Sequence, residues 1–168
     1  MPKVIRIFVR TVDTMNRVIG RFAMYLIFVM LAVLLYSSVS KTFSTPAIWT
    51  LEVAQFLMVA YFLLGGGYSM QLDAHVRMDL LYSRWSPRTS ATMDAITIGF
   101  LIFYLVFLLY GGVSSTLYAL EYGETSYSAW SPRMAPIKIV MTIGVTLMLL
   151  QAIAIFFKDL ASARGETL

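Results

Sequence analysis

The chain has 168 residues, of which 59% are hydrophobic and 13% charged, with no cysteine and a formal net charge of +4. Soluble domains carry about 45–50% apolar and about 25% charged residues, so this composition argues against a soluble protein. The absence of cysteine excludes disulfides, thiol catalysis and cysteine-ligated metals.

The first 18 residues predict an amphipathic helix. Apolar residues recur there at helical spacing, and basic residues fill much of the remaining surface. We expect this segment to lie flat on the cytoplasmic face of a membrane, anchored by Lys3, Arg6 and Arg10. The alternative is a frayed tail whose charges only set the membrane topology. The apolar positions are Val4, Ile5, Phe8, Val9, Val12 and Met15.

Four uncharged, mostly apolar runs of 19, 20, 26 and 19 residues follow. A hydrocarbon core of ~30 Å needs about 20 residues of helix. The sequence therefore predicts an all-α integral membrane protein in which residues 1–168 form a single membrane domain. The runs are Phe22–Ser40, Val53–Leu72, Ala95–Leu120 and Ile139–Phe157. The four transmembrane helices are expected over residues 19–40, 47–72, 91–120 and 136–157.

Prolines mark the expected starts of three helices. Thr45-Pro46, Ser86-Pro87 and Ala135-Pro136 each place proline where the first helical turn has no need of its missing N–H. Threonine and serine are also favourable residues at a helix N-cap.

The basic residues are distributed unevenly, with ten in the segments expected on one face and three on the other. This positive-inside pattern predicts that both termini are cytoplasmic. The basic excess is thereby interpreted as a topology signal and as an attraction to membrane lipids, not as a nucleic-acid footprint. Trp49, Trp85 and Trp130 fall where the same topology places the headgroup regions.

The transmembrane runs contain no ionised residue, which argues against an ion or proton relay. Glu52 lies near the outer end of the second span, so we expect a structural or partner-facing role for it. Gln151 is interpreted as a residue that hydrogen-bonds a neighbouring helix. His75 is the only histidine and has Arg77 and Asp79 nearby. A metal site needs more ligands, so no metal, cofactor or catalytic site is predicted.

Small and aromatic residues mark packing faces. Gly65-Gly66-Gly67 and Gly111-Gly112 permit close backbone approach within the bundle, and the first group is also suited to a seam with a partner. An aromatic band on the third span is expected to face lipid or a partner. Its members are Phe100, Phe103, Tyr104, Phe107 and Tyr110.

The segment from residue 41 to residue 79 carries a resemblance to a known family. It contains a basic residue and an aromatic before a short loop, a Trp-x-x-Glu pattern that opens the second span, small residues along that span, and a His-x-x-x-Asp loop. This pattern resembles the DctQ-like small membrane subunit of tripartite ATP-independent periplasmic (TRAP) transporters. Lys41 stands where arginine is more usual. The residues that carry the resemblance are Lys41, Phe43, Pro46, Trp49, Glu52, Gly65, Gly66, His75, Arg77 and Asp79.

The resemblance implies a three-part importer in the bacterial inner membrane. A periplasmic substrate-binding protein captures an organic acid, and a large membrane subunit moves it with a sodium gradient. This chain is then a non-enzymatic scaffold that holds the large subunit, and the substrate and sodium sites lie elsewhere. Partner-interface or structural roles are implied for Lys41, Trp49, Glu52, Gly65, Gly66, His75, Arg77 and Asp79. Trp85 and Trp130 are interfacial anchors, together with the basic residues of the first segment.

Two other functions remain open on the sequence alone. One is a self-sufficient four-helix transporter, and the other is the membrane-anchor subunit of a different complex.

Overall fold

The computed structural model describes residues 3–43, 47–72 and 87–163. They form four long helices, namely α1 (Lys3–Phe43), α2 (Thr50–Gln71), α4 (Pro87–Glu121) and α5 (Ala135–Ala163). All four are long and apolar enough to cross a membrane. The predicted all-α membrane fold with four transmembrane helices is thereby confirmed.

Proline opens two of these helices. α4 begins at Pro87, and Pro136 is the second residue of α5. α2 begins at Thr50, three residues later than the sequence analysis expected. The Thr50 hydroxyl lies 2.9 Å from the Ala47 carbonyl oxygen, and this contact closes a turn before the helix. Thr45 and Pro46, which were expected to start α2, lie outside the described residues.

α1 is one continuous helix of 41 residues. It passes residues 18 and 19 without a break, whereas the sequence analysis separated an interfacial helix from a span at that point. Val9 and Val12 are buried against Ala154 of α5. Part of the apolar side of this segment thus contacts protein, which differs from the expectation that it lies on lipid. No proline interrupts residues 3–43, so nothing in the sequence forces the helix to end near residue 18.

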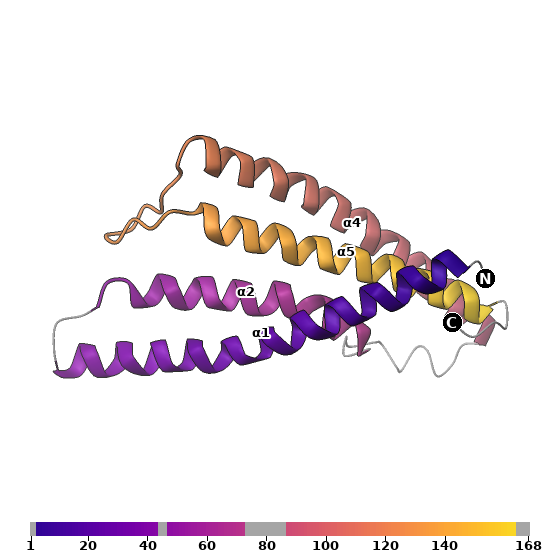
Figure 1. Ribbon diagram of the computed structural model, residues 1–168, viewed down its shortest axis with the longest axis horizontal. Coiled ribbons are helices and arrows are strands. Elements are labelled where there is room, and N and C mark those ends of the chain that lie inside the picture. The colour runs from indigo at the N-terminus through magenta and orange to yellow at the C-terminus, as the bar shows by residue number, and fades with distance from the viewer. Residues whose placement is uncertain (1–2, 44–46, 73–86, 164–168) are drawn as a thin grey trace.

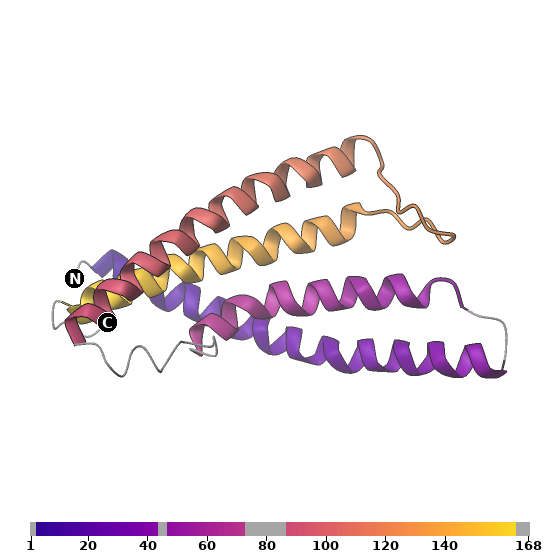
Figure 2. The same cartoon turned by 180° about the vertical axis from the view of Figure 1, so that it is seen from behind.

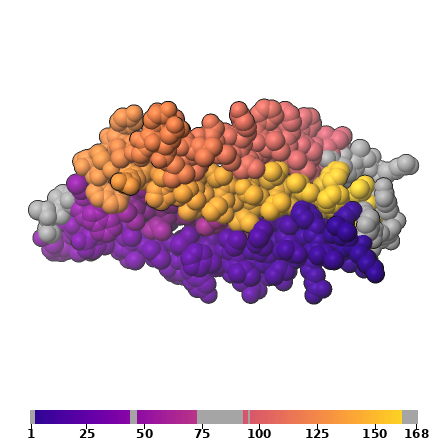
Figure 3. Space-filling model, turned by 45° about the horizontal axis from the view of Figure 1, so that its top comes forward, coloured from indigo at the N-terminus to yellow at the C-terminus, as the bar shows by residue number. Residues whose placement is uncertain are grey.

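α5 lies in the middle of the arrangement, between α2 and α4 (Figure 1, Figure 2). α1 packs along α2, and its first half also reaches α5. The space-filling view shows α5 between α1 and α4 on the face turned to the viewer (Figure 3). The start of α1 and the end of α5 lie at the same end of the bundle. α4 packs chiefly against α5, which leaves most of its surface open.

The buried core is thin, as expected for a protein whose surroundings are also apolar. Leu105 of α4 packs with Val145 and Ala152 of α5 and with Met70 of α2. Most other large apolar side chains on α1 and α4 are exposed. In water such a surface would be an aggregation hazard, whereas in a bilayer it contacts lipid or another subunit.

Glycines allow the backbones of α1, α2 and α5 to come close together. A Cβ atom added to Gly144 of α5 would lie 2.8 Å from the carbonyl carbon of Leu63 in α2. One added to Gly20 of α1 would lie 2.2 Å from the Cβ atom of Tyr68 in α2. Without interhelical water to expel, such close packing is a main source of helix association in membranes.

Candidate functional site

Polar side chains gather at the two ends of the bundle. Within the described ranges, every Asp, Glu, Lys and Arg lies outside the four uncharged runs. The same ranges hold no group of three acidic or histidine side chains arranged for a metal ion. The two polar ends, and not the middle of the helices, are therefore the candidate sites.

At the end where α1 meets α2, aromatic and hydroxyl contacts join the two helices. Trp49 occupies the N-cap position of α2 and stacks on Tyr36 of α1, with ring centroids 5.7 Å apart. The hydroxyls of Thr50 and Ser37 lie 2.9 Å apart, and both residues are buried. Lys41 is exposed in the last turn of α1. Trp49 thus contacts α1, whereas the Lys41 side chain is exposed.

Glu52 connects α2 to the segment between α4 and α5. Its carboxylate lies in the first turn of α2, where the helix dipole favours a negative charge. The Ser126 hydroxyl donates to its Oε1 atom at 3.3 Å. Its Oε2 atom is buried and has no hydrogen-bond partner among the described residues. Glu52 therefore contacts and braces this loop.

That loop, residues 122–134, is a short hairpin, here called the α4–α5 hairpin. Thr125 and Arg133 form an antiparallel bridge, and the Ser126 N–H donates to the Pro132 carbonyl oxygen at 2.9 Å. The Lys138 ammonium at the start of α5 pairs with the carboxylate of Glu124. These contacts join the two sides of the hairpin and connect its base to α5.

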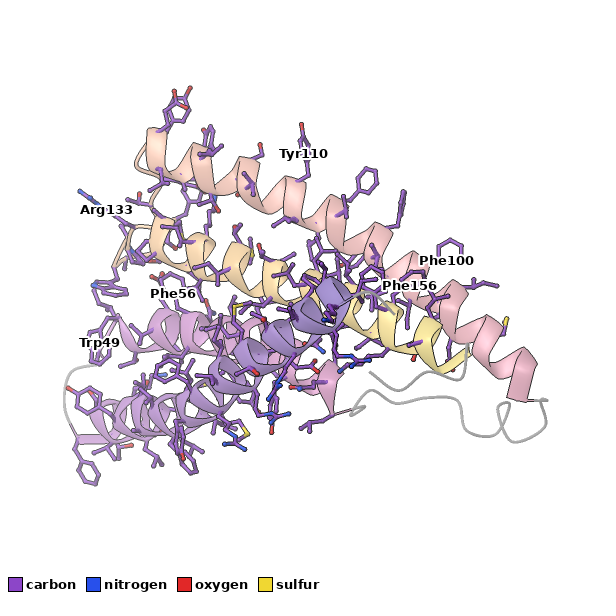
Figure 4. The ribbon with its side chains drawn as sticks, turned by 45° about the vertical axis from the view of Figure 1, so that its right-hand side comes forward. Trp49, Phe56, Phe100, Tyr110, Arg133 and Phe156 are labelled. Atoms are coloured by element: carbon purple, nitrogen blue, oxygen red, sulfur yellow. The ribbon has the colours of Figure 1, made fainter. Side chains whose placement is uncertain are left out.

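The tip of the α4–α5 hairpin presents aromatic side chains. Tyr127 is fully exposed, and Trp130 is 40% exposed. Arg133 lies at the same end of the bundle as Trp49 (Figure 4). Exposed Tyr, Trp and Arg side chains are the residue types that most often dominate protein interfaces.

At the opposite end, a buried polar network joins α1 to α5. The Asn16 amide donates to Gln151 Oε1 at 2.8 Å, and the Gln151 amide donates to Asp13 Oδ1 at 2.9 Å. The Lys158 ammonium donates to Asp13 Oδ2 at 2.6 Å. Asn16 and Gln151 have no exposed surface. Gln151 thus does hydrogen-bond a neighbouring helix, as the sequence indicated.

Asp13, Asn16 and Lys158 were not predicted from the sequence as members of this network. One signal was available, because Asn16 follows Val9 and Val12 at helical spacing and therefore lies on their side of α1.

The predicted glycines differ in what they contact. Gly66 faces Met148 of α5, whose Sδ atom would lie 2.8 Å from an added Cβ atom. Gly67 approaches Asn16 of α1. Gly65 and Gly111 have open space at the Cβ position, and Gly112 has only an ordinary contact with α5. The expected tight packing therefore applies to two members of the first group and to neither member of the second.

The remaining candidates fall into three sets. The basic residues Lys3, Arg6 and Arg10 are exposed on α1. The aromatic band of α4 is exposed along its length, and its residues Phe100 and Tyr110 point away from α5 (Figure 4). The candidates His75, Arg77, Asp79 and Trp85 lie outside the described residues.

Comparison with known proteins gives one family. Residues 38–162 match the family described as tripartite ATP-independent periplasmic transporters, DctQ component. The match includes α2, α4 and α5, whereas Asp13 and Asn16 precede it. No curated protein matches the chain.

Proposed function

Because the chain belongs to the DctQ component family of tripartite ATP-independent periplasmic transporters, we propose that it is the static frame of a sodium-driven organic-acid importer. It is a small permease subunit and a multi-pass protein of the inner membrane. In this proposal a periplasmic binding protein delivers the organic acid, and a large membrane subunit moves it. The present chain holds the large subunit in place and moves no solute itself.

The observation that carries this proposal is the absence of charged residues from the four apolar runs. Transport pathways for ions or protons through a membrane contain ionisable groups at depth. In the described part of this chain such groups occur only outside the uncharged runs. The polar contacts that do occur along the bundle join helix to helix, as between Gln151 and Asn16 or between Thr116 and Thr142. These are features that stabilise a frame.

For the orientation, we propose that both termini are cytoplasmic. The ten basic residues of the predicted inner segments support this, since cytoplasmic loops carry most of the lysine and arginine of a membrane protein. In this orientation the α4–α5 hairpin is periplasmic, and the network of Asp13 and Lys158 is near the cytoplasmic surface.

Reconstitution of uptake tests the frame proposal. Vesicles that contain this chain, the large subunit and the binding protein should take up an organic acid when a sodium gradient is imposed. Vesicles that contain this chain alone should show none, because its spans offer no ionisable pathway. Uptake by the chain alone would overturn the proposal in favour of a self-sufficient transporter. Full uptake without this chain would also overturn it.

The α4–α5 hairpin is proposed to contact the binding protein. Replacing Tyr127 and Trp130 together by alanine should raise the binding-protein concentration needed for half-maximal uptake by about fivefold or more, as for interface aromatics. The maximal rate and co-purification with the large subunit should remain unchanged, because neither side chain is buried in the bundle. Tyr110→Ala on α4 is the matched control and should leave the half-maximal concentration unaltered. An unchanged value for the hairpin variant would contradict this contact.

A further inference from the structure

A crevice opens between α1 and α2, with one wall from α5; it is here called the α1–α2 crevice. Its cavity volume is about 440 Å³, within the range of about 300–1,000 Å³ that is common for ligand sites. The side chains and backbone that matter here are those of Gly20, Met24, Phe62, Gly65, Gly66 and Met148.

The crevice exists because α2 lacks side chains where its wall would otherwise be filled. A Cβ atom added to Gly65 would meet no atom within 4 Å. Phe62 of α2, the C-cap residue Leu72 and Met24 of α1 line the crevice and are exposed, so its opening faces the surroundings of the bundle. α1 and α2 are both long and apolar enough to span a membrane, so this opening faces the apolar interior of a membrane.

The dimensions of the crevice indicate the shape of its occupant. The lining residues extend along α2 from Tyr61 to its C-cap Leu72, which is about 17 Å. The crevice is open along one side, and its length and apolar lining match an extended hydrocarbon chain.

The basic residues beside the crevice indicate which polar group the bound molecule carries. Arg17 comes one helical turn before Gly20 on the same side of α1 and is exposed. Arg21 follows Gly20 directly and is exposed as well. The hydroxyl groups of Tyr68 and Ser69 line the crevice and are able to donate hydrogen bonds. An apolar slot with a cationic end and hydroxyl donors is complementary to an acyl chain, an ester group and a phosphate.

We propose that the α1–α2 crevice binds a membrane phospholipid, with one acyl chain over Gly65 and Gly66 and its phosphate beside Arg17. The lipid fills the space that Gly65 leaves open and links α1 to α2 on the outside of the bundle. This site goes beyond the proposed transport role and does not depend on it.

Photolabelling in vesicles tests this site. The full-length chain, with any subunits that accompany it from the membrane, is placed in vesicles of phosphatidylethanolamine and phosphatidylglycerol. A small share of the phosphatidylglycerol carries a diazirine on one acyl chain. After illumination, labelled peptides are identified by mass spectrometry. Labelling should be concentrated on peptides that contain Met24, Phe62 and Met148.

Two pairs of variants test the site against general lipid contact. Gly65→Leu fills the crevice and should reduce its labelling to the level found on the exposed face of α4. Gly111→Leu, whose Cβ position is equally open, should leave the labelling unchanged.

Arg17→Gln should reduce labelling by phosphatidylglycerol by about fivefold, the effect expected for the loss of one surface cation. It should not reduce labelling by a diacylglycerol that carries the same diazirine. Lys41→Gln, at the other end of α1, should alter neither.

Other results would overturn the site. One such result is that the crevice is still labelled in Gly65→Leu. Another is that the label is spread evenly over all apolar faces of the bundle. A third is that the crevice cross-links to another polypeptide and not to lipid. Because Arg17 is exposed, Arg17→Gln leaves the packing of the bundle intact. If Arg17→Gln reduces labelling by phosphatidylglycerol but not by diacylglycerol, the site is supported even if Gly65→Leu proves unstable. If Arg17→Gln, Gly65→Leu and the wild-type chain are labelled equally, the site is contradicted.

Discussion

Replacing Gly144 by alanine is expected to loosen the bundle by about 1–3 kcal/mol, the usual cost of an overpacked contact. The added Cβ atom would lie 2.8 Å from the carbonyl carbon of Leu63 and 2.9 Å from its oxygen. These are backbone atoms of α2, which cannot turn aside as a flexible side chain can. The helices α2 and α5 must therefore separate. The measurement is the free energy of unfolding of the purified chain in detergent, followed by circular dichroism.

Gly111→Ala on α4 provides the comparison for this effect. Its added Cβ atom meets nothing within 4 Å, so no contact has to shift. Alanine is a better helix former than glycine by about 0.5–1 kcal/mol, and this variant should be as stable as wild type or slightly more stable. Equal stability of the two alanine variants would show that α2 and α5 do not approach each other closely at Gly144.

The second large effect is expected for Gln151→Leu, which should destabilise the chain by about 1–3 kcal/mol. The substitution nearly preserves volume, but it removes the acceptor of the Asn16 amide and one donor to Asp13. Asn16 has no exposed surface, so water cannot take over these hydrogen bonds. Thr14→Val serves as the matched control, because the Thr14 hydroxyl is exposed and bonds only its own helix.

A double-mutant cycle identifies the network as the cause. Asn16→Leu together with Gln151→Leu removes both partners of the hydrogen bond between α1 and α5. The loss of stability should then be smaller than the sum of the two single losses, since no buried amide is left without its partner. Additive losses would indicate that the two residues act separately, which would contradict the network.

The sequence predicted the features that depend on single segments. Four runs of sufficient length predicted four spanning helices, and Pro87 and Pro136 marked two helix starts. The aromatic band of α4 was correctly expected to lie on the surface. Each of these follows from hydropathy, length or local backbone chemistry, which a segment carries without its neighbours.

Features that need two distant segments were harder to predict. Gln151 was identified as a residue that joins helices, but its partners on α1 lie more than 130 positions away. The isolated Gly20 and Gly144 also make close approaches, whereas only consecutive glycines were predicted to do so. The bracing of the α4–α5 hairpin by Glu52 also depends on tertiary placement. Pairings of this kind arise from how the helices cross, which the hydropathy pattern does not specify.

The length of α1 has a mechanical consequence. Its 41 residues form a helix about 62 Å long, whereas the hydrocarbon core of a bilayer is about 30 Å thick. Even at a steep inclination of about 40°, a straight path through that layer is only about 39 Å long. More than 20 Å of the helix must therefore extend past the lipid tails, and this is the part that carries five cations. Rocking of the subunit would drag those cations through the lipid headgroups, and we therefore propose that this extension resists such rocking.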